Sequence, residues 1–192
     1  MNVKTYLKIK VIDERGKCTY HRRYRSRSFV IGFLREFYSN LSGQGITSVN
    51  INGQQYTTNS GDRMAVSDGA NDSTYGILVG SGTSAPTIID HSLSILIPNG
   101  TSTGQLQYGA VNIYSPVTNT STNSGYFTVS RTFTNNSGSS VTVSEVGMAA
   151  WDGAYVGSPG QFYLILHDLL PTPITVPNGS SLTISYEIQV TT

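Results

Sequence analysis

The sequence predicts a mainly β protein: an antiparallel β-sandwich of the jelly-roll or Ig-like type, with an N-terminal β-hairpin and one short amphipathic helix. The first observation is composition, because only 12% of the 192 residues are charged, about half the usual share. Ser, Thr, Asn and Gly supply the polar surface instead, and they favour turns and half-buried strands. The second observation is a succession of short apolar runs separated by turn clusters, which is typical of a sandwich or barrel.

The N-terminal segment predicts a strand, a turn, a second strand and a helix. Residues 3–12 alternate between an apolar face and a lysine face, and residues 18–27 return as a strongly basic strand. A helix follows, with Ser28 as the expected N-cap and Gly43 as the residue that ends it. Its apolar positions share one helix face, which predicts that this face packs in the core. They are Val30, Phe33, Leu34, Phe37, Tyr38 and Leu41.

The rest of the chain is strand after strand. Asn52-Gly53 is a strong signal for a tight hairpin, and a polar loop follows at 59–74. No flexible linker divides the chain, so we place a domain boundary near residue 45, between a basic β-β-α head at 1–45 and the antiparallel β-sandwich at 46–192. The expected strands lie at 46–51, 54–58, 75–80, 92–97, 105–114, 125–135, 140–149, 160–167 and 181–191.

Two charged residues fall on the apolar faces of consecutive predicted strands. Arg131 shares a face with Phe133, and Glu145 shares a face with Val143. If a five-residue connection joins the strands as a hairpin, Arg131 lies directly opposite Glu145, with Cβ atoms about 5 Å apart. A lone Arg–Glu pair lacks a nucleophile, a second acid or base and a metal. We therefore interpret it as a structural ion pair that fixes strand register.

The formal net charge of +1 conceals a strong asymmetry. The segment through Glu36 carries +7 and the remainder −6, which predicts that the N-terminal head contacts an acidic partner. Nucleic acid, another acidic protein or the acidic remainder of a neighbouring copy each fit, and a solvated basic hairpin is the alternative without a partner. The candidate contact residues are Lys8, Lys10, Arg22, Arg23, Arg25 and Arg27.

Motifs for catalysis or cofactor binding are missing from the sequence. The three histidines are far apart and lack metal-ligand spacing, and no G-x-S-x-G elbow or phosphate-binding loop occurs. The acidic residues of the 59–74 loop match no EF-hand pattern. We therefore expect no enzymatic activity, no cofactor and no metal. The one cysteine, Cys18, excludes an internal disulfide, and without a secretory signal or a long apolar run we expect folding in a cytoplasm.

Aromatic residues are a further candidate for partner or ligand contacts. The chain has 12 tyrosines and a single tryptophan, Trp151. Tyr and Trp combine a large apolar area with a polar tip, which suits interfaces and sugar-stacking platforms. Trp151 and nearby Tyr155 are the candidate ligand or interface aromatics, and ordinary strand positions are the alternative.

Four segments together resemble a known class of proteins. They are YGILVGSGTSAPTIIDHSL at 75–93, LQYGAVNIYSP at 106–116, SRTFTNNSGSSVTVSEVGM at 130–148 and LILHDLLPTPITVPNGSSLTISYEI at 164–188. This progression is similar to that of small virion structural proteins of tailed bacteriophages and related prokaryotic viruses. The match covers about residues 75–190, and its motifs are structural rather than catalytic. The basic head lies outside it.

The resemblance implies a capsid decoration, minor capsid or tail-associated protein that works as a homo-oligomer within the virion. On this hypothesis the sandwich binds copies of itself or the major capsid or tail protein, and the basic head anchors on an acidic lattice surface. The alternative is a carbohydrate-binding adhesin, which predicts Trp151 and Tyr155 exposed in a loop. Nucleic-acid binding by the head ranks last, because no RNA- or DNA-binding motif supports it. No membrane partner is expected.

Overall fold

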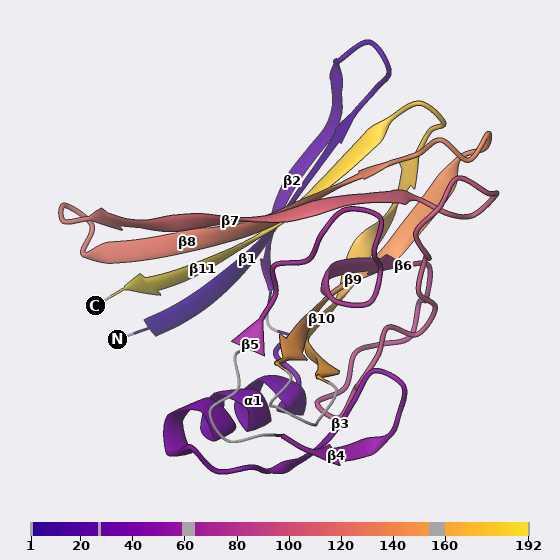
Figure 1. The fold of residues 1–192 in the computed structure, drawn as a ribbon. Coiled ribbons are helices and arrows are strands. Elements are labelled where there is room, and N and C mark those ends of the chain that lie inside the picture. The colour runs from indigo at the N-terminus through magenta and orange to yellow at the C-terminus, as the bar shows by residue number, and fades with distance from the viewer. Residues whose placement is uncertain (1, 27, 59–63, 154–159, 192) are drawn as a thin grey trace.

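The structure is a computed structural model that describes residues 2–26, 28–58, 64–153 and 160–191. It is mainly β, with antiparallel sheets and one short helix among the described residues, which confirms the prediction of a mainly β, antiparallel protein. Figure 1 shows the long strands of one sheet crossing above the strands of a second, with the helix at the opposite end of the molecule from the β1–β2 turn.

Sheet A has five strands in the order β2-β1-β11-β8-β7, and all neighbours are antiparallel. It brings the two ends of the chain together, because β1 and β11 pair along their whole length. Alternation of side chains places the apolar residues of β1 on the face toward the core and its lysines on the outer face. The strands are β1 Asn2–Ile12, β2 Cys18–Ser26, β7 Gln107–Asn119, β8 Ser124–Thr134 and β11 Ser181–Thr191.

Sheet B is built around β9, which pairs with β10 on one side and with β6 and β5 on the other. A separate hairpin, β3–β4, forms around Asn52-Gly53 as predicted, and Gly53 has a positive φ of 77°. Residues 92–97, expected as a strand, contribute only an isolated bridge from Leu96 to Gly80. The bounds are β3 Thr47–Val49, β4 Gln55–Thr57, β5 Met64–Ala65, β6 Gly76–Gly80, β9 Val141–Asp152 and β10 Gln161–Val176.

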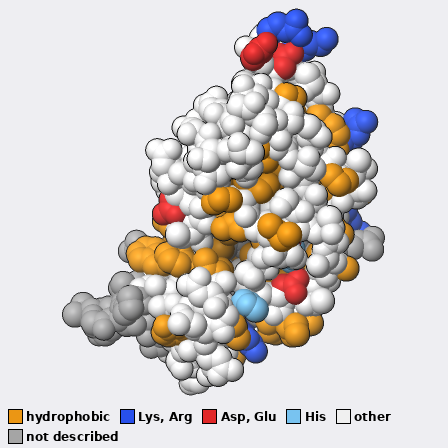
Figure 2. All heavy atoms as spheres, turned by 90° about the vertical axis from the view of Figure 1, so that its right-hand side faces the viewer, with side chains coloured by type: hydrophobic (Ala, Val, Ile, Leu, Met, Phe, Trp, Pro, Cys, Tyr) orange, Lys and Arg blue, Asp and Glu red, His pale blue; other side chains and the backbone are white. Residues whose placement is uncertain are grey.

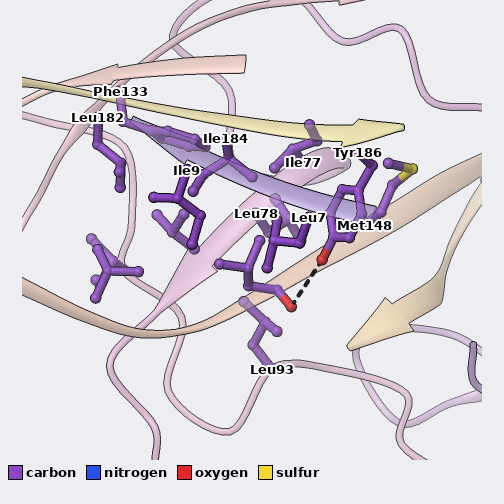
Figure 3. Packing of buried hydrophobic residues seen from close by; sticks show 14 of the residues in the cluster. Leu7, Ile9, Ile77, Leu78, Leu93, Phe133, Met148, Leu182, Ile184 and Tyr186 are labelled. Atoms are coloured by element: carbon purple, nitrogen blue, oxygen red, sulfur yellow. Dashed lines mark hydrogen bonds between the residues drawn. The ribbon is translucent and has the colours of Figure 1, made fainter. Parts of the chain in front are cut away.

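The hydrophobic core lies between sheets A and B. Ile184 and Tyr186 of sheet A and Ile77 and Met148 of sheet B point into one cluster, which Figure 3 shows from close by. The Tyr186 hydroxyl donates a hydrogen bond to the Val146 carbonyl on the other sheet, at 3.5 Å. Burial of these side chains is the main stabilising contribution, at about 25 cal/mol for each Å² of apolar surface removed from water.

The predicted boundary near residue 45 does not separate two structural units. β1 lies in the interior of sheet A, between β2 and β11, and Leu7, Ile9 and Val11 are buried in the common core. The N-terminal hairpin is therefore part of the main sheet. The sequence could not show this, because the strand that pairs with β1 lies at the other end of the chain.

Helix α1 spans Ile31–Ser42 and ends at Gly43, as predicted, with that residue in the left-handed conformation at φ 64°. Its N-cap position is Val30, not Ser28. The Ser28 hydroxyl instead donates to the Asp168 carboxylate at 2.6 Å. A long-range carboxylate acceptor has taken the place of the backbone N–H donor that an N-cap serine contacts.

Candidate functional site

The orientation of α1 differs from the prediction at most of its apolar positions, although Val30 is buried and Phe33 packs partly against the core. The buried residues within the helix are Gly32, Glu36 and Ser39, and the helix packs against β10. Gly32 makes this approach close, because a Cβ there would lie 2.2 Å from the Leu164 carbonyl oxygen. The predicted core positions Leu34, Phe37, Tyr38 and Leu41 are exposed instead, and Leu41 keeps 72% of its surface accessible.

The exposed side of α1 borders a large apolar groove. The groove has a volume of about 820 Å³ and lies between the helix, the two sheets and β5. Among the described residues that line it, none is charged and Ser67 is the only polar one. We call it the apolar groove. Its lining residues include Val3, Phe33, Phe37, Met64, Ile113, Phe127 and Ile188.

Further apolar side chains are exposed at this end of sheet A. Val190, level with Val3, lies on the groove side, whereas Tyr114, Val117 and Tyr126 of the β7–β8 hairpin lie on the outer face of the sheet. Figure 1 shows the end of this hairpin and both chain termini at the same end of sheet A. Isolated exposed apolar residues are ordinary, but a continuous apolar surface such as the apolar groove marks an interaction site.

Arg131 on β8 lies at the centre of a buried cluster. Its guanidinium is fully buried. Its nitrogens donate to the carbonyl oxygens of Gly69, Asp72, Tyr75, Ile77 and Gly109 at 2.6–3.1 Å. One nitrogen also contacts the Asp68 carboxylate at 3.0 Å. Because most of these acceptors belong to residues 68–77, Arg131 holds that loop against sheet A.

Glu145 on β9 forms the second buried cluster. Its carboxylate accepts hydrogen bonds from the backbone N–H groups of Gly82, Ser94 and Ile95 at 2.8–3.0 Å. It also contacts Nε2 of His167 at 2.8 Å, while Nδ1 of that ring contacts the Asp90 carboxylate at 2.7 Å. Glu145 therefore organises the loop that follows β6 as Arg131 organises the loop before it.

The charges of the Glu145 cluster support one another. Burial opposes a charged imidazole, but its hydrogen bonds to the Glu145 and Asp90 carboxylates outweigh this and raise the pKa of His167. Burial also opposes ionisation of Glu145, yet the contact with His167 and the backbone N–H donors lower the pKa of its carboxyl. In the Arg131 cluster the balance differs, because burial raises the pKa of Asp68 more than Arg131 lowers it.

The predicted ion pair between Arg131 and Glu145 is wrong, although both residues are fully buried. β8 pairs with β7 and β11 in sheet A, and β9 belongs to sheet B. The connection between them crosses from one sheet to the other. Buried Asn135 holds this crossing, because its side-chain amide donates to the carbonyls of Ser139 and Val176. Each charge then finds its partners in a loop.

The His167 cluster is the arrangement that most resembles acid–base machinery. Both ring nitrogens are engaged by carboxylates, and the ring itself is buried. A general base needs a nitrogen free to accept a proton from a substrate, so this geometry suits a fixed structural cation. Among the described residues, no group of three or more His, Cys, Asp or Glu side chains is arranged to hold a metal ion.

The predicted basic contact residues do not all share one face. Lys8, Lys10, Arg23 and Arg25 lie on the outer face of sheet A, whereas Arg22 points to the opposite side, level with Ile9. Lys8 and Arg23 both contact the Glu187 carboxylate of β11. Arg27 lies outside the described residues.

The aromatic candidates give little support to a sugar platform. Trp151 lies within β9, is half-buried and packs near Tyr75, with ring centroids 6.4 Å apart. The adhesin hypothesis predicted that Trp151 would be exposed in a loop. Tyr155, its proposed companion, lies outside the described residues.

Sequence reasoning missed Asp68, Asp90 and His167 as partners of the buried charges. One local signal for the Glu145 site was present in the Gly80-Ser81-Gly82 segment. A Cβ at Gly80 or Gly82 would lie 2.5 or 2.4 Å from Oε1 of Glu145. The two glycines therefore allow the loop backbone to reach the carboxylate.

No protein-family model matches the chain, and neither a curated protein nor a solved structure shows significant similarity to it. No helix in the described ranges combines the length and apolar character needed to cross a bilayer.

Proposed function

We propose that the protein is a non-enzymatic virion structural protein, which self-associates, binds the capsid or tail lattice of a phage-like particle, or does both. The observation that carries the proposal is the outward-facing apolar side of α1 beside the apolar groove. A chain that buries Glu36 and Ser39 while leaving Phe37 and Leu41 exposed gains hydrophobic stabilisation when a partner covers this surface.

Three features support a structural role over a catalytic one. The buried charges Arg131 and Glu145 are used to hold loops, and both nitrogens of His167 are occupied. The surface is also poor in charge. Figure 2 shows one face made mainly of uncharged polar groups and apolar side chains, with a cluster of charged groups at the β1–β2 turn and a few single ones elsewhere. Surfaces depleted of charge suit extensive protein contacts.

The placement in a virion rests on the sequence resemblance over residues 75–190. Those residues include both loop-organising charges, Arg131 and Glu145, and the strands that carry them. Within the proposal, the two sheets and their shared core form a sandwich of the jelly-roll or Ig-like type. Such a sandwich offers a rigid body whose end surfaces and loops contact neighbouring subunits.

The assembly surface can be tested with two matched substitutions. Leu41 on α1 and Ile89 in the loop after β6 are 72% and 73% exposed, so Glu at either position has a similar solvation cost in the monomer. We expect the wild-type protein to sediment as an oligomer and Leu41→Glu to shift it toward the monomer. Ile89→Glu should leave the sedimentation profile unchanged.

The particle itself provides the second measurement. We expect the protein to be detected by mass spectrometry in purified particles from cells that produce it, and to bind them again after mild dissociation. Leu41→Glu should reduce that binding at least about tenfold, a loss of about 1.4 kcal/mol. A monomeric protein that is missing from the particles contradicts the proposal.

A further inference from the structure

The outer face of sheet A carries a cationic surface made by β1 and β2. The outward side chains of these strands include Lys4, Lys8 and Lys10 on β1 and Arg23 and Arg25 on β2. Lys8 lies opposite Arg23, and Lys10 lies opposite His21. Outward positions repeat about every 7 Å along a strand, and strands lie about 4.8 Å apart. We call these five lysines and arginines the basic face.

Burial makes the exterior more basic than the formal charge of +1 indicates. Among the described residues, six of the ten acidic side chains are buried, whereas Arg131 is the only buried lysine or arginine. The buried acids are Glu36, Asp68, Glu145, Asp152, Asp168 and Glu187. A second copy of the chain therefore offers little exposed carboxylate to the basic face.

One carboxylate organises the middle of the basic face. Glu187 contacts Arg23 at 2.9 Å and also Lys8, and it stabilises these two like charges side by side. The Arg23 guanidinium is further fixed over the Tyr6 ring, 3.5 Å from its centroid. Lys4, Lys10 and Arg25 have no acidic partner among the described residues. Their charges are available to a ligand.

The middle of this sheet face is hydroxylated, and its exposed apolar side chains Tyr114, Val117 and Tyr126 lie at one end, on the β7–β8 hairpin. The outward positions of β11 and β8 include Thr183, Ser185, Ser130 and Thr132. A protein–protein interface needs an apolar or aromatic centre, which the middle of this face lacks. Hydroxyls beside Lys and Arg are instead the groups that contact phosphate and sugar in nucleic-acid complexes.

We propose that the basic face binds the phosphate backbone of a nucleic acid without sequence specificity. Regularly spaced cations suit a polymer whose charges also repeat regularly. The contact needs no base readout, because Tyr6, the aromatic residue among these cations, is already covered by Arg23. This inference does not depend on the apolar groove or on a place in a virion.

Fluorescence anisotropy with a labelled 30-nucleotide oligo(dT) strand and a 30-base-pair duplex tests the proposal over a range of NaCl concentrations. We expect affinity to fall as salt rises, by about 0.7 in log K per log salt for each phosphate contacted on a single strand. The double variant Lys10→Gln/Arg25→Gln should weaken binding about tenfold at low salt and reduce the slope by about 1.4.

The matched control is Arg22→Gln/Arg35→Gln, which removes two charges that lie off the basic face, on the other side of β2 and on α1. It should leave the salt slope unchanged. Equal thermal melting of all variants would show that folding is intact. Absence of binding, equal losses in the two double variants, or equally tight binding of polyglutamate would overturn the proposal, and the last result would assign the face to an acidic protein.

Discussion

Arg131 and Glu145 occupy equivalent situations in the two sheets but are satisfied by different chemistry. Arg131 donates to five backbone carbonyls and one carboxylate, whereas Glu145 accepts from three backbone N–H groups and one histidine. A permanently charged guanidinium is thus held mostly by neutral dipoles. The carboxylate depends in part on His167, a side chain whose charge depends on pH and whose pKa is raised by its two carboxylate partners.

This comparison shows how a chain with few regular elements between residues 66 and 106 can have ordered loops. A buried charge is costly unless it is fully hydrogen-bonded, so each loop that supplies the partners is required for folding. In return, each charge fixes the backbone of its loop. The two clusters differ in what disrupts them. The Arg131 cluster is disrupted when the guanidinium donors are removed, and the Glu145 cluster when a side chain is added to its close-packed loop or when the pH rises.

The largest expected effect is on the Arg131 cluster. Arg131→Met keeps much of the side-chain volume but leaves Asp68 and five carbonyls without their donor. We expect a loss of about 3–5 kcal/mol in the free energy of unfolding, as for other buried charges that lose a partner. Urea denaturation measures it, and Arg22→Met, an exposed arginine in the same sheet, should change stability by less than about 0.5 kcal/mol. A loss below about 1 kcal/mol at Arg131 would show that its hydrogen bonds are dispensable.

The next effect is steric. It is tested by comparing Gly82, in the loop held by Glu145, with Gly69, in the loop held by Arg131. Gly82→Ala places a Cβ 2.4 Å from the Glu145 carboxylate, so we expect a loss of about 1–3 kcal/mol. Gly69 also contacts a buried charge through its backbone, yet a Cβ there meets nothing within 4 Å. Gly69→Ala should therefore cost less than about 0.5 kcal/mol. Equal unfolding midpoints for the two variants would refute the close approach at Glu145.

A smaller effect is the pH dependence of the Glu145 cluster. The pKa of His167 is raised on folding, so its stabilisation is present below about pH 6.5 and is lost as pH rises through the folded value. The pKa values of Glu145 and Asp90 are lowered, so their stabilisation is lost only in acid. We expect the unfolding free energy to fall as pH rises from about 6.5 through the folded pKa of His167.

Urea curves at several pH values measure this decline, which should be reduced in His167→Gln. The exposed His21 provides the control, because His21→Gln removes a histidine that contacts neither buried cluster. A decline that persists unchanged in His167→Gln would assign the pH dependence to other groups.

The smallest expected effect is the coupling between the two clusters. Arg131 and Glu145 share no hydrogen-bond partner, so a double-mutant cycle of Arg131→Met and Glu145→Gln should give less than about 0.5 kcal/mol. The cycle of Glu145→Gln with His167→Gln should give about 1–3 kcal/mol. A large Arg131–Glu145 coupling would instead support the hairpin pairing that the strand pattern suggests.

Local pattern explains much of the secondary structure. Period-two alternation located the long strands, Asn52-Gly53 located a hairpin, and Gly43 marked the end of α1. The same alternation placed Arg131 and Glu145 on inward faces, where both are buried. These features depend on neighbours in the chain, so the sequence by itself determined them.

The partners of those residues were decided only by the tertiary structure. The Asn135 crossing separates β8 from β9, the pairing of β1 with β11 makes the head part of the main sheet, and Gly32 turns the polar side of α1 inward. Each of these three arrangements depends on contacts between backbone groups of segments that are distant in the sequence. Side-chain periodicity shows which face of a helix is apolar, but it does not show which surface covers that face. For this reason the exposure of Phe37 and Leu41 on α1 could not be predicted from the sequence.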